Sequence, residues 1–288
     1  MPLPAILAAS LVFAPADAHA AYRAASEIVS RYTPRDAGAP GAAGAAGFIL
    51  SAALSCGCDA FADSFCAPTP AGTKTFTNVH AEFKIDEDAG WMVFLSHFDT
   101  KAGTNCPGAN DGASTSGLLV GMCKALARQR KSLKCNVMLV WTDGEECFER
   151  YAPGDGLWGS RRAAEKLAAE RRRTLAVICL DMLGDRDLSV TMPSNCSAGL
   201  RKIALCAARA VGLGERVKES PVEVIDDHVP FAEAGFETLE LIDFEYGSRK
   251  GANDYWHSPL DAMDKVSEKS LLDAGRLAMK LADAIPPG

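Results

Sequence analysis

Apolar runs and stretches with helical periodicity alternate along this chain. Continuous apolar runs, rich in β-branched residues and bounded by turn residues, predict strands at residues 78–83, 91–97, 135–142, 175–182 and 238–242. Apolar residues at helical spacing predict helices at residues 22–31, 114–128, 157–171, 198–211 and 268–284. Strands that alternate with helices predict one α/β domain with a largely parallel sheet covered by helices.

The stretch 40–47 is rich in glycine and alanine, as some nucleotide-binding loops are. It lacks the preceding strand and the glycine spacing of such a loop, so we interpret it as a turn that opens the next helix. The sequence shows no internal repeat, no long linker and no shift in composition, which agrees with a single domain.

Composition and charge indicate a globular domain and argue against one class of binding partner. The 288 residues are 48% hydrophobic and 23% charged, which is ordinary for a globular domain with a sizeable core. The formal net charge of −7 and the sequence pI near 5.3 argue against nucleic acid as a partner.

The N-terminal stretch has some features of a secretory signal peptide. Residues 3–15 are apolar, and Ala18-His19-Ala20 fits the small-x-small pattern of a cleavage site. No Lys or Arg precedes the apolar run, and prolines interrupt it. We predict a signal peptide at residues 1–20, one domain at residues 21–288, and a secreted or periplasmic protein. No other stretch is long and apolar enough to span a bilayer.

The ten cysteines fall into two groups. Those within apolar patterns are predicted to be core thiols, namely Cys123, Cys135, Cys179 and Cys206. Those in loops or near the ends of elements are the better disulfide candidates in an exported protein, namely Cys56, Cys58, Cys66, Cys106, Cys147 and Cys196. The sequence does not specify the pairing, and Cys56-Gly-Cys58 lacks the second cysteine pair that a structural zinc site needs.

Residues of metal-binding types follow several of the predicted strands. His97 and Asp99 share a face if their strand continues, so Asp99 can orient the His97 imidazole. A glycine-rich turn delivers Asp111, Asp143-Gly144 leads into Glu145-Glu146, and Asp181 ends the fourth strand. A later loop carries His257. Open α/β sheets bind their ligands at the carboxyl ends of the strands, where these residues are expected to lie.

A lone Asp at a strand end is more often a cap or turn residue, and a lone His is usually a satisfied polar side chain. Together, two imidazoles and at least three carboxylates without a cysteine fit catalytic zinc. Two zinc ions that share a carboxylate would lie about 3.5–4 Å apart. Successive side chains of an extended backbone point opposite ways, so one residue of Glu145-Glu146 can bind metal while the other moves a proton.

At these residues the chain resembles the M28 family of zinc aminopeptidases and, within that superfamily, the glutaminyl cyclases. The resemblance covers nearly all of the chain after about residue 22. The matching motifs occur in family order: Ser-His97-Phe-Asp99, Gly-Ala-Asn-Asp111-Gly-Ala-Ser, Asp143-Gly-Glu145-Glu146, Leu-Asp181-Met, Asp227-His228-x-Pro-Phe231 and Trp256-His257-Ser-Pro. The resemblance implies a phosphorylase/hydrolase-like three-layer α/β sandwich with a mixed, largely parallel central sheet.

The resemblance also implies a metal-binding role for five matching residues. Asp111 would bridge two metal ions. Glu146 and His257 would complete one site, and His97 with Asp181 would complete the other.

Two reactions fit the remaining matches, in which Glu145 is the general base, Asp99 orients His97, and Asp226 matches a proton-handling carboxylate of the cyclases. In an aminopeptidase, Glu145 takes a proton from an attacking water beside two zinc ions. In a glutaminyl-peptide cyclotransferase, Glu145 takes it from the substrate's own α-amine beside one zinc ion, and ammonia leaves.

The pocket residues favour neither branch alone. Trp256 matches the cyclases, but Glu240 stands where they have a pocket histidine and Tyr151 where they have a tryptophan. Glu240 and Glu245 could supply anionic contacts for a free α-ammonium group, whereas Tyr151 and Trp256 could supply aromatic walls.

We therefore predict a zinc aminopeptidase that acts on peptide N-termini with two zinc ions. The alternative is a glutaminyl-peptide cyclotransferase with one zinc ion. A non-catalytic domain that kept the fold and lost the metal is a third class, which the complete set of ligand residues argues against.

Overall fold

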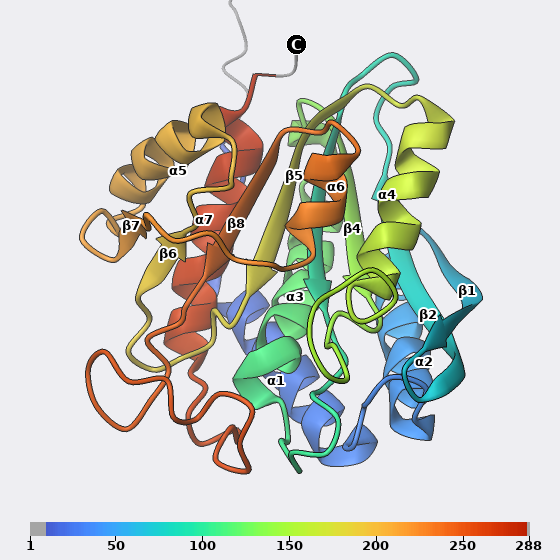
Figure 1. Ribbon diagram of the computed structural model, residues 1–288. Helices are drawn as coiled ribbons and strands as arrows, with labels where there is room; N and C mark the ends of the chain where they lie inside the picture. Colours follow the sequence, from blue (N-terminus) through green and yellow to red (C-terminus); the bar gives the residue numbers. More distant parts are fainter. Residues whose placement is uncertain (1–9, 287–288) are drawn as a thin grey trace, which may run out of the picture.

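A single sheet forms the centre of the computed structural model, which describes residues 10–286 (Figure 1). Its eight strands lie in the order β1-β2-β4-β3-β5-β8-β6-β7. They are β1 (Asp59–Thr69), β2 (Gly72–Phe83), β3 (Trp91–His97), β4 (Asn136–Thr142), β5 (Thr174–Asp181), β6 (Val190–Met192), β7 (Val217–Glu219) and β8 (Thr238–Ile242). Strands β4, β3, β5 and β8 are parallel, whereas β1, β2 and β6 add antiparallel pairs. This confirms the mixed, largely parallel α/β sheet.

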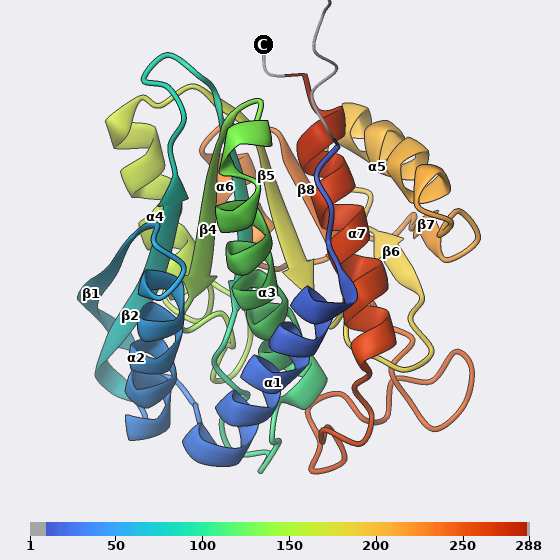
Figure 2. The same cartoon turned by 180° about the vertical axis from the view of Figure 1, so that it is seen from behind.

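Helices cover both faces of the sheet (Figures 1 and 2). One face carries α1 (Pro15–Tyr32), α2 (Pro40–Leu54), α3 (Thr115–Arg128), α5 (Ala198–Ala210) and α7 (Glu268–Ala284); the other carries α4 (Trp158–Glu170) and α6 (His228–Glu233). Strand β3 is buried on both sides: Met92 and Phe94 pack into one core, Val93 and Leu95 into the other. Burial on both faces explains why the central strands are continuous apolar runs.

The predicted strands are all present, and the missed ones lie at the edges of the sheet. Strand β1 alternates exposed and half-buried residues, so it lacks an apolar run, and β6 and β7 are only three residues long each. Strand β2 begins at Gly72, before the predicted residue 78, because its first half pairs only with β1.

Two predictions about the N-terminal region were wrong. Helix α1 begins at Pro15 instead of residue 22, because Ala18 and Ala21 pack against α3, where Gly117 admits the α1 backbone closely. The stretch 40–47 is not a turn: α2 begins at Pro40, a favoured residue for the first helical position.

The predicted signal peptide lies partly outside the described residues, which begin at residue 10. Within them, Leu11 and Phe13 are buried and Ala20 lies inside α1. The signal peptide stays a prediction. Across residues 10–286, no helix combines the length and the apolar character needed to cross a membrane.

All ten cysteines are free thiols. Cys123, Cys135 and Cys179 are buried, as predicted for core thiols. The same prediction for Cys206 was wrong: this residue is exposed on α5, and its sulfur accepts a hydrogen bond from Arg209. Of the six disulfide candidates, Cys58, Cys106, Cys147 and Cys196 are buried, which is why loop position alone was a poor guide to exposure.

Candidate active site

The parallel strands end together at one edge of the sheet, and the candidate residues lie there. His97 at the end of β3 is aligned with Thr142 at the end of β4, and Asp181 at the end of β5 with Ile242 at the end of β8. This alignment brings together residues that are far apart in the sequence, as expected for the carboxyl ends of parallel strands.

The first candidate metal set consists of Asp111, Glu146 and His257. The Nε2 atom of His257 lies 2.8 Å from Glu146 Oε1 and 3.3 Å from Asp111 Oδ2. Burial raises the pKa of Glu146 to about 7. Burial alone would lower the pKa of His257, but hydrogen bonds with Asp111 and Glu146 raise it to about 9.

The second set consists of His97, Asp111 and Asp181. The Nε2 atom of His97 lies 3.2 Å from Asp111 Oδ1 and 3.2 Å from Asp181 Oδ1. Asp111 therefore belongs to both sets, with one carboxylate oxygen facing each histidine. Within residues 10–286 these are the groups of ligand atoms close enough to share an ion, and all five residues are those singled out from the sequence.

A strained turn delivers Asp111. It lies in a π-helical turn, Ala109–Ser114, where Gly112 has a φ of 91°. A Cβ atom at Gly112 would lie 2.9 Å from the Asp99 carbonyl oxygen, so glycine lets Asp111 approach His97. The backbone N–H groups of Asn110 and Asp111 donate to the carboxylate of Asp261 at 2.7 and 3.1 Å.

Two buried residues that the sequence analysis missed support this turn. Tyr246 donates its hydroxyl hydrogen bond to Asp261 at 2.5 Å. Arg35 is fully buried and donates to the carbonyl oxygens of Phe98 and Gly108 at 2.7 and 2.9 Å, beside Asp99 and the Asp111 turn. Neither Tyr246 nor Arg35 lies in an apolar run or in one of the matching motifs, so the sequence did not indicate their role.

Asp99 fixes the glutamate pair. Its carboxylate accepts hydrogen bonds from the backbone N–H groups of Glu145 at 3.0 Å and Glu146 at 3.1 Å. The same carboxylate lies 3.4 Å from His97 Nδ1. Asp99 therefore connects the end of β3 with the loop after β4. Gly144, with a φ of 74°, starts this loop where a Cβ atom would strike the Phe76 ring.

A cavity of 560 Å³ opens over these residues. Its polar part contains Asp111, Glu145, Glu146, Asp181, Asp226 and His257. Its apolar walls are Tyr151, Val222, Ile225, Phe244 and Trp256. Trp256 is 37% exposed, stacks on the His257 ring at a centroid distance of 3.8 Å and meets Phe244 edge-on. The cavity is a small, partly aromatic pocket with carboxylates at one end.

The pKa values of two carboxyl groups in the cavity are raised. Burial raises the pKa of Glu145 well above its ordinary value, and the charge of Asp226 adds to the effect. Burial also raises the pKa of Asp226, and here the neighbouring charge is Glu240. Carboxyl groups with a pKa raised by burial and by a neighbouring charge are candidates for proton transfer.

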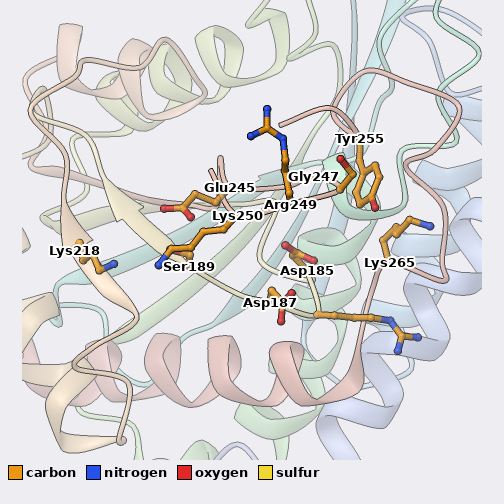
Figure 3. Close-up of a pocket in the computed structure, with 12 residues that line it drawn as sticks. Asp185, Asp187, Ser189, Lys218, Glu245, Gly247, Arg249, Lys250, Tyr255 and Lys265 are labelled. Carbon is orange, nitrogen blue, oxygen red and sulfur yellow. The ribbon is translucent and has the colours of Figure 1, made fainter. Parts of the chain in front are cut away.

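Glu240, which the sequence analysis predicts to be a pocket residue, does not line the cavity. It is fully buried, and its Oε2 atom lies 2.7 Å from His228 Nδ1. Glu245 does not line the cavity either. It borders a separate, charged cavity of 460 Å³ together with Lys218, Lys250 and Asp185 (Figure 3).

The residues present fit a zinc ion. The first set offers one imidazole and two carboxylates, which are ligand types that bind zinc and leave a fourth position open. Glu146 is buried, and its Oε2 atom has no hydrogen-bond partner. A cation bound there would satisfy this atom and neutralise the clustered carboxylates.

An α/β sandwich with this site at its strand ends defines an enzyme of the class that includes zinc exopeptidases and glutaminyl cyclases. The chain belongs to peptidase family M28, whose sequence model matches residues 78–282. The family implies zinc as the metal.

The similar proteins include glutaminyl cyclases and a solved structure described as an exopeptidase. A glutaminyl-peptide cyclotransferase of Drosophila melanogaster is 28% identical over 66% of this chain, and this chain spans 59% of its length. The crystal structure of a glutaminyl cyclase from an Acidobacteriales bacterium superposes with a TM-score of 0.88 at 31% identity, covering 99% of this chain and 98% of that one. A Zn-dependent exopeptidase from Parabacteroides distasonis shares the fold, with a TM-score of 0.83 at 18% identity over 95% and 99% of the chains.

Proposed function

We propose that this protein is a glutaminyl-peptide cyclotransferase, which converts an N-terminal glutamine of a peptide to pyroglutamate and releases ammonia. The aromatic cavity directly above Asp111, Glu146 and His257 is the observation that carries the proposal. The relatives named as glutaminyl cyclases support it.

The shape and chemistry of the cavity suit an intramolecular attack. For its α-amine to reach its own γ-amide, a glutamine side chain must fold back on itself, and a tight pocket favours such a conformer. Tyr151 and Trp256 both line the cavity, and Phe244 meets the Trp256 ring edge-on. These rings would enclose the folded side chain.

The two glutamates considered as anionic contacts in an aminopeptidase do not line the site cavity. Glu240 is buried against His228, and Glu245 borders the charged cavity of Figure 3. Glu223 is the remaining acidic residue on the apolar side of the site cavity, and it is exposed at the rim. Neither Glu240 nor Glu245 is therefore placed to bind an α-ammonium group in the site cavity.

Proton transfer would be the task of the chain's own carboxyl groups. A zinc ion held by Asp111, Glu146 and His257 would polarise the γ-carbonyl of the substrate as a Lewis acid. Glu145 lies in the same cavity and would take the proton from the α-amine, then return it to the γ-amide nitrogen as ammonia leaves. The negative charge of Asp226 raises the pKa of Glu145, so Asp226 would stabilise Glu145 in its protonated form.

A two-zinc aminopeptidase is the second candidate, because one observation favours it. His97 and Asp181 form a complete second set with Asp111, as two-metal hydrolysis requires. In a one-zinc cyclase the same three residues would instead be joined by the direct contacts of 3.2 Å.

Metal titration with paired substrates separates the two functions. Protein stripped of metal is given one and then two equivalents of zinc and is assayed with a glutaminyl peptide and with an amino-acid anilide. The cyclase proposal expects ammonia from the peptide, complete at one equivalent, and no cleavage of the anilide. Anilide cleavage that needs the second equivalent would establish the aminopeptidase instead.

A further inference from the structure

Three cysteine sulfurs meet outside the active site. Cys56 and Cys58 lie in the turn between α2 and β1, and Cys123 lies in the middle of α3. The Sγ atom of Cys58 is 3.7 Å from that of Cys123, across 65 residues of sequence. The Sγ atom of Cys56 donates to the Ala52 carbonyl oxygen at 3.4 Å, and the Cys123 thiol is near enough to lower the pKa of Cys56. Cys123 is therefore within reach of both cysteines of the Cys-Gly-Cys sequence.

The three thiols differ in access and reactivity. Cys123 is fully buried, Cys58 is 7% exposed and Cys56 is half-buried. The Cys123 thiol lowers the pKa of Cys56 to about 7, and the charge of Lys124 adds to the effect. Since the thiolate is the nucleophile in disulfide chemistry, Cys56 is the thiol suited to react first with an external reagent.

A groove leads to this position. It has a volume of 680 Å³ and lies between α1, α2 and α3, with Arg23, Glu27 and Lys124 among its lining residues. Ser55, the neighbour of Cys56, also lines it. The groove therefore reaches the residue next to Cys56 in the sequence, and Cys56 itself is half-buried.

We propose that Cys56, Cys58 and Cys123 form a thiol–disulfide exchange site that reacts with low-molecular-weight disulfides and ends in a Cys58–Cys123 disulfide. The Cys56 thiolate attacks the external disulfide, forms a mixed disulfide and releases one thiol. Cys123 holds its proton, because its thiol neighbours and its burial raise its pKa. It then displaces the second external thiol from Cys56, and its proton passes to that leaving thiolate. Cys58 takes over the bond to Cys123, which restores the Cys56 thiol. In sum, two protein thiols are oxidised and one external disulfide is reduced to two thiols.

The turn can make the small movement that the bond requires. Closing 3.7 Å to the length of a disulfide, about 2.0 Å, needs a shift of roughly 1.7 Å. Gly57 lies between the two cysteines with a φ of 73°, and nothing lies within 4 Å of a Cβ atom placed there. The Cys-Gly-Cys turn therefore has free space on this side.

Thiol counting after oxidation tests the proposal. The full-length protein is incubated with oxidised glutathione, unfolded, alkylated and mapped by mass spectrometry. The map should link Cys58 to Cys123, and none of the other eight cysteines should be linked to another cysteine of the chain. Ten alkylated cysteines, or a bridge that excludes Cys123, would overturn the proposal. The readout is independent of catalysis, so it stands apart from the proposed cyclase function.

Single variants test the order of the steps. Cys123→Ser should abolish the bridge and leave a glutathione adduct on Cys56. Cys56→Ser should still form the Cys58–Cys123 bridge, but about tenfold more slowly, because the accessible thiolate is lost. The matched control is Cys206→Ser, which removes an exposed thiol on α5 and should leave the bridge and its rate unchanged. Formation at the wild-type rate in Cys56→Ser would contradict the role of Cys56 as the entry thiol.

Discussion

At the scale of single residues, the two neighbouring glutamates have different surroundings. Glu146 contacts His257 at 2.8 Å and belongs to the metal set, whereas Glu145 belongs to neither set and faces the cavity. Asp99 holds both backbones by one hydrogen bond each. The geometry therefore allows Glu146 to bind metal while Glu145 transfers a proton. These two roles stay predictions.

Replacing Glu145 by Gln tests the proton-transfer role. The variant keeps the size of the side chain and leaves Asp111, Glu146 and His257 in place, so it should bind zinc as the wild type does. Its turnover should fall by about a hundredfold or more, since general acid–base catalysis contributes on that scale. Zinc content and kcat are measured on the same preparation. Wild-type turnover in the zinc-loaded variant would rule out Glu145 as the shuttle.

The pH dependence of stability tests the buried Glu240. Burial raises the pKa of Glu240 to about 8, so the folded state holds a proton that the unfolded state releases near its ordinary value. The resulting stability is present at acidic pH and is lost as pH rises toward 8. Glu240→Gln cannot titrate, so its Tm relative to wild type should rise between about pH 5 and pH 8.5. Parallel Tm curves for the two proteins would show that Glu240 does not titrate in this range.

At the scale of elements, loops between the strand ends and the helices place the ligands, and buried polar residues hold these loops. Arg35 follows α1 and donates to the carbonyl oxygens of Phe98, Pro107 and Gly108. Burial lowers the pKa of Arg35 to about 10, so it stays charged at neutral pH. One side chain thus joins the N-terminal helix layer to the loops that carry Asp99 and Asp111.

Loss of Arg35 should loosen the metal site. In Arg35→Met the bonded carbonyl oxygens lose their donor, and the free energy of unfolding should fall by about 3 kcal/mol or more. Zinc affinity should fall as well, because the turn at Asp111 loses a support. Chemical denaturation and zinc titration measure the two effects. The control is Arg31→Gln: this arginine is exposed, forms an ion pair with Glu27 and lies over the Tyr32 ring, so neither quantity should change. Equal behaviour of the two variants would contradict the role given to Arg35.

The sequence predicted the central elements, and it singled out the residues that meet in the candidate metal sets, because each left a local signal. Strands buried on both faces are continuous apolar runs, and His97, Asp111 and Asp181 directly follow or end such runs or sit in glycine turns. Strands β6 and β7 are too short to show a period, and the position of Asp261 or Tyr246 depends on tertiary contacts alone. The burial of Glu240 in β8 could not be inferred, since an acidic residue in an apolar run is equally consistent with a pocket.

At the scale of the whole molecule, bound metal should stabilise the fold. The ligands come from the end of β3, from the loops after β3, β4 and β8, and from the end of β5, so an ion would join most of the sheet's carboxyl edge. A ligand that binds only the folded state raises stability by mass action. A chelator should therefore lower the Tm of the wild type. Asp111→Ala should contain no zinc and should show no chelator effect. A zinc-replete Asp111→Ala would contradict the central position of Asp111.

The predicted signal peptide belongs to the same scale. Phe13 is buried in the core, and Asp17 forms an ion pair with Arg128. Cleavage after Ala20 would remove both residues. We predict that the protein is exported and cleaved after Ala20. The intact mass of the protein recovered outside the cytoplasm identifies its first residue. A mature protein that still contains Phe13 would contradict cleavage at this position.

The product formed from one peptide tests the central claim most directly. A peptide that begins with glutamine is incubated with the zinc-loaded protein, and the products are identified by mass spectrometry together with an ammonia assay. A glutaminyl-peptide cyclotransferase should return the whole peptide lighter by one ammonia, with ammonia formed in equal amount. A shortened peptide with free glutamine, and no ammonia, would contradict the claim and assign the site to an aminopeptidase.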